Sequence, residues 1–138
     1  MDARTGSPKT VDMRALALDL LLEAERGTEY ENTLLKGTLD KYDYLNGRDK
    51  AFLKRLVDGV TERRLQLDYV LEQFSSLPVR KMKPLIRCVL RMGAYQILFM
   101  DGVPDSAACN EAVKLAKKRR FAQLSGFVNG VLRKLCSQ

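Results

Sequence analysis

Residues 88–100 read CVLRMGAYQILFM, and they form the longest apolar stretch of the chain. Only Arg91 and Gln96 interrupt it, so apolar side chains surround nearly the whole circumference of a helix built from these residues. A helix of this kind lies inside a protein with other helices packed around it. The stretch is also too short for a bilayer, which requires about 20 apolar residues. It therefore predicts a central helix, which begins near Pro84.

Gly93 stands in the middle of this predicted helix. A glycine there costs about 1 kcal/mol relative to alanine, because the unfolded chain loses more backbone freedom. The glycine suggests that another helix passes close to the central helix at this point. We therefore predict a close helix–helix crossing at Gly93.

Apolar residues recur at helical spacing on both sides of the central helix, and no stretch alternates as a strand does. Gly27 is expected to end the first helix, and Asn46 and Ser125 are expected to be N-caps. Two helices are predicted at about residues 11–25 and 30–39. Five more are predicted to begin after Asn46, after a break at 63–64, near residues 83–84, near residues 104–105 and after Ser125. This count predicts an all-α bundle of about seven helices, with a flexible tail at 1–9 and one domain at 10–138.

The net charge of +7 is distributed unevenly along the 138 residues. Residues 1–77 carry 12 basic and 14 acidic side chains, whereas residues 78–138 carry 12 basic and 3 acidic ones. A basic half suggests a polyanionic partner, because Lys and Arg replace the counterions of a phosphate backbone. The alternative is a charged surface that only keeps the protein in solution.

The residues needed for the common kinds of catalytic or metal site are missing from the sequence. The chain has no histidine, no CxxC pair and no glycine-rich phosphate-binding motif, so we expect no catalytic residue and no metal or cofactor site in this chain. Cys88, Cys109 and Cys136 are interpreted as small core residues. An odd number of cysteines without a signal peptide favours the reducing cytoplasm, and we expect no membrane contact.

Basic residues form three clusters in the second half of the chain. Phe121 directly follows the densest cluster, where it could stack on an unpaired base or simply pack in the core. The clusters are Lys114, Lys117, Lys118, Arg119 and Arg120; Arg80, Lys81, Lys83, Arg87 and Arg91; and Arg133 with Lys134. These clusters indicate a basic helical domain that binds nucleic acid.

Four stretches resemble the NusB fold family in this order and spacing. They are residues 49–71 (DKAFLKRLVDGVTERRLQLDYVL), 90–104 (LRMGAYQILFMDGVP), 110–118 (NEAVKLAKK) and 126–135 (GFVNGVLRKL). The resemblance implies seven or so helices in two packed subdomains. Asn129 lies in the last of these stretches, and we interpret it as a buried hydrogen-bonding residue that fixes the last helix.

Two branches of the family imply two functions. The motifs are most similar to the N-terminal domain of Sun/Fmu-type (RsmB) methyltransferases, which make 5-methylcytosine in small-subunit ribosomal RNA. The chain would then position ribosomal RNA for a C-terminal S-adenosylmethionine-dependent domain, which this sequence does not contain. The alternative is a free-standing NusB-type antitermination factor that binds boxA RNA with a ribosomal protein, and a third reading is a helical adaptor for an acidic protein.

The resemblance also implies where RNA would meet the chain. The positions lie at the start of the first helix, at the head of the central helix and at the connection between the last two helices. They hold Lys9 and Arg14, then Lys83, Arg87 and Arg91, then Lys114, Lys117, Lys118, Arg119, Arg120 and Phe121.

Overall fold

The computed structural model describes residues 11–27 and 29–138 of the chain. Within these residues the secondary structure is helical throughout, so the all-α prediction is confirmed. The predicted tail at 1–9, which includes Lys9, lies outside the described residues. The α-helices are α1 (Met13–Arg26), α2 (Glu31–Lys41), α3 (Gly47–Glu62), α4 (Arg64–Phe74), α5 (Pro84–Phe99), α6 (Asp105–Lys118) and α7 (Ser125–Cys136), with short 3-10 helices η1 (Val79–Lys81) and η2 (Ala122–Leu124).

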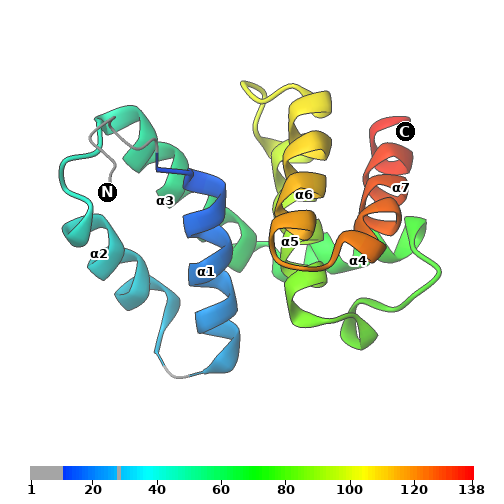
Figure 1. Ribbon diagram of the computed structural model, residues 1–138, viewed down its shortest axis with the longest axis horizontal. Helices are drawn as coiled ribbons and strands as arrows, with labels where there is room; N and C mark the ends of the chain where they lie inside the picture. The colour runs from blue at the N-terminus through cyan, green and yellow to red at the C-terminus, as the bar shows by residue number, and fades with distance from the viewer. Residues whose placement is uncertain (1–10, 28) are drawn as a thin grey trace.

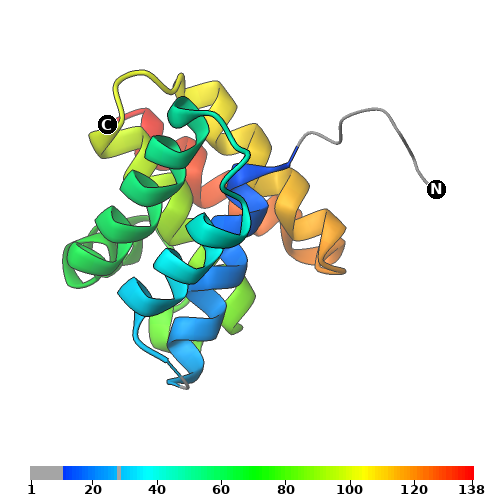
Figure 2. The same ribbon diagram turned by 90° about the vertical axis from the view of Figure 1, so that its left-hand side faces the viewer.

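The helices form two groups that meet along the central helix. Helices α1, α2 and α3 pack on one another on one side, and α4, α6 and α7 pack around α5 on the other (Figure 1). Figure 2 shows the first group in front, with α6 and α7 behind it. Helix α5 contacts α1, α3, α4, α6 and α7, which explains why its sequence is apolar on nearly all sides. The prediction of two packed subdomains around a central helix is confirmed.

Most of the predicted helix ends agree with the structure. Gly27 ends α1 with a left-handed φ of 77°, where a side chain would be strained. The side chain of Asn46 accepts a hydrogen bond from the backbone N–H of Asp49 at 2.8 Å, as an N-cap does. The break near residues 63–64 separates α3 from α4.

Two helix starts differ from the sequence prediction. Ser125 was predicted to be an N-cap, and this is wrong, because Ser125 is already the first residue of α7. Its hydroxyl donates to the carbonyl of Ala122 at 2.7 Å and so closes the preceding 3-10 turn instead. Asp12, by contrast, is an unpredicted N-cap, which accepts from the backbone N–H groups of Arg14 and Ala15.

The predicted close crossing at Gly93 is confirmed. A Cβ atom at this position would lie 2.7 Å from Cδ1 of Leu132, so only a glycine lets α7 approach α5 this closely. Both residues belong to the core, where close packing leaves little room for an added methyl group.

A half-buried glutamate at the start of α2 makes stability depend on pH. Oε2 of Glu31 is buried, and among the described residues it has no hydrogen-bond partner. Burial, and after it the neighbouring carboxyl group of Asp58, raises the pKa of Glu31 to about 7. The folded chain then holds this proton more tightly than the unfolded chain, so the free energy of unfolding should fall as the pH rises from about 4.5 through 7.

Replacement of Glu31 by glutamine should remove this loss, because glutamine has no proton to release. Urea unfolding at pH 5 and pH 8 should therefore show a smaller pH effect for Glu31→Gln than for the original chain. An equal pH effect in both proteins would contradict the proposed burial of this carboxyl group.

Candidate nucleic-acid interface

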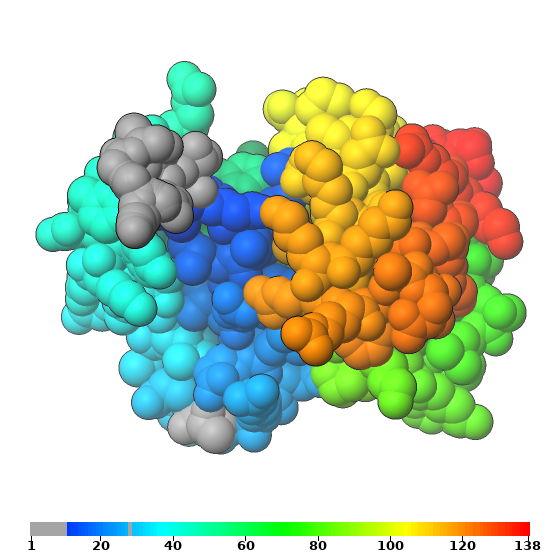
Figure 3. Space-filling view, in the orientation of Figure 1, coloured from blue at the N-terminus to red at the C-terminus, as the bar shows by residue number. Residues whose placement is uncertain are grey.

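The densest basic cluster lies at the end of α6, where the chain turns toward α7. Helix α6 ends at Lys118, and Arg120 adopts a left-handed φ of 71° to make the turn. Figure 3 shows this connection on the surface of the molecule, next to α1. Lys114, Lys117, Lys118 and Arg120 are all exposed, so their charges face solvent. The structure thus brings most of the predicted α6 cluster together on one open surface, which is referred to below as the α6 basic surface.

Arg119 and Phe121, which lie in the connection after α6, contact other parts of the chain. Arg119 pairs with Asp19 of α1 at 2.6 Å, and its side chain is 30% exposed. Phe121 is half-buried and packs against the core, which favours core packing over a freely exposed stacking platform. The backbone N–H of Phe121 also donates to the carbonyl of Ala116 at 2.8 Å and holds the turn. Both residues therefore help to fix the position of the exposed cations.

Arg14 from α1 lies close to the α6 basic surface. A surface hollow of about 510 Å³ is lined by both Arg14 and Lys118, together with Phe52 of α3. Arg14 is held there because its Nε donates to Oε1 of the buried Gln96 at 2.7 Å, and its guanidinium lies 5.1 Å from the centre of the Phe52 ring. The predicted site at the start of α1 and the predicted site at the end of α6 thus share one face.

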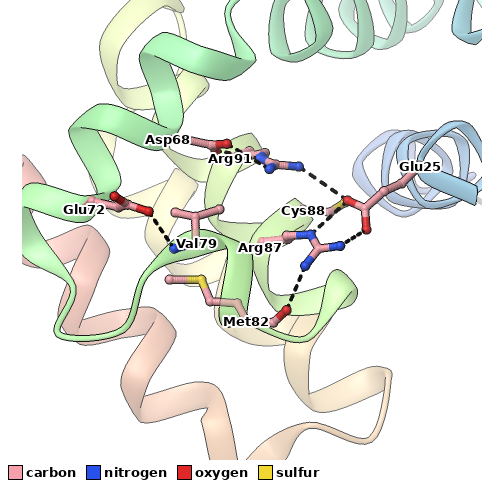
Figure 4. A network of polar contacts seen from close by, with 8 residues as sticks. All are labelled: Glu25, Asp68, Glu72, Val79, Met82, Arg87, Cys88 and Arg91. Carbon is pink, nitrogen blue, oxygen red and sulfur yellow. Dashed lines mark hydrogen bonds and ion pairs between the residues drawn. The ribbon is translucent and has the colours of Figure 1, made fainter.

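The arginines of α5 lie in a different environment from the lysines of α6. Arg91 binds both carboxylate oxygens of Asp68 in α4, at 2.7 and 2.9 Å, and its side chain is only 11% exposed. It also contacts Glu25 of α1 at 3.4 Å (Figure 4). A bidentate pair of this kind is geometrically specific and strong. Arg91 thus joins α5 to both α1 and α4.

Arg87 completes this ion-pair network. Its guanidinium contacts both carboxylate oxygens of Glu25 and donates to the carbonyl of Met82 at 2.9 Å. Burial acts to raise the pKa of Glu25, but the hydrogen bond and charge of Arg87, with the charge of Arg91, outweigh it and leave that pKa below its usual value. Glu25 is therefore ionised at neutral pH and neutralises part of the charge that the sequence assigned to RNA binding.

Lys83 remains exposed at the head of α5. Lys83 is the N-cap residue of α5 and is exposed, and α5 begins at the same end of the molecule at which α6 ends (Figure 1). The predicted contact of Lys83 with RNA remains a prediction, as do those of the other residues. The sequence could not show that Arg87 and Arg91 would be paired, because Glu25 and Asp68 come from distant parts of the chain.

The cysteines lie in or beside the core of the described residues. Cys88 and Cys109 are buried and Cys136 is half-buried, all as free thiols. Burial raises the pKa of Cys88 to about 12, so this thiol stays protonated at neutral pH and is a poor nucleophile. Over residues 11–27 and 29–138, no group of three or more Cys, Asp or Glu side chains is placed to hold a metal ion. No helix in these ranges is long and apolar enough to span a bilayer.

Comparison with curated proteins relates the chain to two kinds of protein. It is 37% identical over 127 residues to the "Probable ribosomal RNA small subunit methyltransferase B" of Bacillus subtilis (strain 168), an alignment that covers 92% of the chain and 28% of that protein. It is 33% identical over 123 residues to the transcription antitermination protein NusB of Pseudarthrobacter chlorophenolicus, with 88% of each covered. The chain thus spans little more than a quarter of its methyltransferase relatives.

The fold and the family model agree with these relatives. The solved structure of NusB from T. maritima has a TM-score of 0.80 and 26% identity, and the match covers 91% of the chain and 89% of that structure. The model of the NusB family matches residues 11–137, which is nearly the whole described chain. The resemblance seen in the sequence motifs is confirmed, and the chain belongs to the NusB family.

Proposed function

We propose that this chain is the RNA-binding module of a ribosomal RNA cytosine-5 methyltransferase. It would hold small-subunit ribosomal RNA while a C-terminal domain, with S-adenosylmethionine, performs the methyl transfer. The observation that supports this branch best is the match to methyltransferases at 37% and 36% identity over about nine-tenths of the chain. Two antitermination relatives match at 33% over a similar length.

The surface that supports RNA binding is the α6 basic surface with Arg14 beside it. Exposed cations without an ion pair can replace counterions along a phosphate backbone. Among the described residues, Lys117, Lys118 and Arg120 are exposed and form no ion pair, and Lys83 is exposed at the start of α5. Arg87 and Arg91 are left out of the proposed surface, because their guanidinium groups already neutralise Glu25 and Asp68.

A second candidate function is that of a free-standing antitermination factor. The observation that favours it is the match to NusB of Pseudarthrobacter chlorophenolicus, which covers 88% of both proteins. In that case the partners would be boxA RNA and a ribosomal protein. Under the third reading, the α6 basic surface would contact an acidic protein partner instead of RNA.

Titration with two RNA molecules at two salt concentrations distinguishes these functions. We expect the chain to prefer a small-subunit ribosomal RNA hairpin to a boxA single strand. With about four to six phosphate contacts, the affinity should fall roughly a hundredfold to a thousandfold between 50 and 200 mM salt. A preference for boxA would favour antitermination, and failure to bind either RNA at low salt would contradict both RNA-binding proposals.

A further inference from the structure

The groove between α6 and α7 adjoins the α6 basic surface but has a different chemistry. It is an open surface groove of about 790 Å³, lined by small residues of both helices, among them Ala107 and Gly126. A Cβ atom added at Gly126 would meet nothing within 4 Å, so the groove is open there. The polar residues that line it include Asn110, Glu111, Lys114, Asn129 and Arg133.

Arg133 connects the two walls of the groove. Its Nη2 donates to Oδ1 of Asn110 on α6 at 2.9 Å, and its Nε donates to Oδ1 of Asn129 on α7 at 3.1 Å. Asn110 and Arg133 are exposed, and Asn129 is half-buried. The sequence interpretation of Asn129 as a buried residue is therefore wrong, since its amide lies in the wall of an open groove.

The bridge determines which way both amide groups face. A guanidinium group has donors only, so each asparagine must turn its oxygen toward Arg133. The two NH2 groups, with two donors each, are left on the other side of each amide plane. Arg133 thus orients two asparagine side chains as hydrogen-bond donors within a single groove.

The same groove also offers an acceptor. Glu111 lines it, and its carboxylate lies 3.3 Å from Nζ of Lys114. A phosphate diester or a peptide carboxylate can only accept hydrogen bonds and would leave the Glu111 carboxylate without a donor. A nucleobase edge combines donors and acceptors, and amide and carboxylate side chains are the groups that commonly read such edges.

We propose that the groove between α6 and α7 binds an unstacked nucleobase of single-stranded RNA through the amides of Asn110 and Asn129. This inference rests on the proposed RNA-binding function. Lys114 belongs both to the groove and to the α6 basic surface, so a strand whose phosphates follow Lys117 and Lys118 reaches the groove without a gap. Arg133 acts as a positioning residue that holds both amides.

The test uses four octaribonucleotides that consist of uridines except for one varied central base. We expect the full chain to bind the best of the four at least about fivefold more tightly than the worst, the lower end for a good side-chain contact to a base edge. Asn110→Ala and Asn129→Ala should reduce this ratio below about twofold. Both should keep the salt dependence of binding, because an amide contact to a base releases no counterion.

The control variant is Asn32→Ala, which removes the same group from an exposed position on α2. It should keep the discrimination between bases. A second measurement does not depend on any variant: adding the preferred octaribonucleotide to the unmodified chain should shift the side-chain amide NMR signals of Asn110 and Asn129 more than that of Asn32.

The outcomes separate this inference from the proposed function. Salt-dependent binding with equal affinity for all four octaribonucleotides, or with unmoved Asn110 and Asn129 signals, would overturn the groove assignment and leave the RNA-binding function standing. The groove assignment would also be overturned if Asn110→Ala and Asn129→Ala discriminated between the four bases as well as the unmodified chain does. No binding of any octaribonucleotide by the unmodified chain, even at low salt, would overturn the inference, and the proposed function would fall with it only if the ribosomal RNA hairpin also failed to bind.

Discussion

Changing Lys117, Lys118 and Arg120 to glutamate should weaken RNA binding by roughly a hundredfold or more at low salt, because three phosphate-binding charges become repulsive. These three side chains are exposed on the α6 basic surface. Arg119 is left unchanged in this variant, since its ion pair with Asp19 holds the connection against α1. Filter binding or fluorescence anisotropy with a ribosomal RNA hairpin measures the effect.

The variant should also show a weaker dependence of affinity on salt, because fewer counterions are released. Its helical circular-dichroism spectrum should be unchanged, since none of the three side chains is buried. The matched control changes Lys36, Lys41 and Arg64 to glutamate, which alters the net charge equally on exposed positions of α2 and α4. An equal loss in both triple variants would show that only net charge matters and that the α6 basic surface is not the site.

Gly59→Ala should destabilise the fold by about 3 kcal/mol, at the upper end of the usual range for overpacking a core. Gly59 lies in α3, and a Cβ atom there would stand 2.1 Å from Cζ of Tyr95 in α5. Tyr95 is 6% exposed and its ring also packs beside Phe99, so it has little space to move away. A loss of this size should lower the thermal midpoint by roughly 10 °C in a chain of this length.

Gly37→Ala provides the control, because a Cβ atom at this exposed position of α2 meets nothing within 4 Å. This substitution should stabilise the chain by up to about 1 kcal/mol, since alanine favours a helix over glycine. Combining Gly59→Ala with Tyr95→Leu should recover part of the lost stability, because leucine lacks the atoms that collide. If Gly59→Ala melted at the temperature of the unmodified chain, the close contact of α3 with α5 would be refuted.

Local signals in the sequence predicted the helices and several of their ends. Gly27 and Asn46 act within one turn of their own helix, and the stripe around residues 52–60 repeats with the helical period. The Ser125 prediction failed because a 3-10 turn precedes α7 and uses the serine hydroxyl itself. The close approach at Gly59 could not be predicted, since nothing near it in the sequence indicates that Tyr95 would lie against it.

The candidate site was predictable in part. The α6 cations lie within one stretch of seven residues, so the sequence was enough to place them together. Arg87 and Arg91 occur in another stretch with five cations, yet the fold brings Glu25 and Asp68 to them. The sequence could count these charges but could not show which of them would be neutralised.

The sequence by itself determined the class of this protein: an all-helical domain with a central apolar helix, a basic second half and the motifs of the NusB family. These properties follow from helical periodicity, composition and short-range order, which neighbouring residues carry. The tertiary structure decided which cations stay free, which ones bind α1 and α4 together, and how Arg133 aligns Asn110 with Asn129. Such contacts join residues far apart in the chain, and they form only because burial of the apolar helix faces brings those residues together.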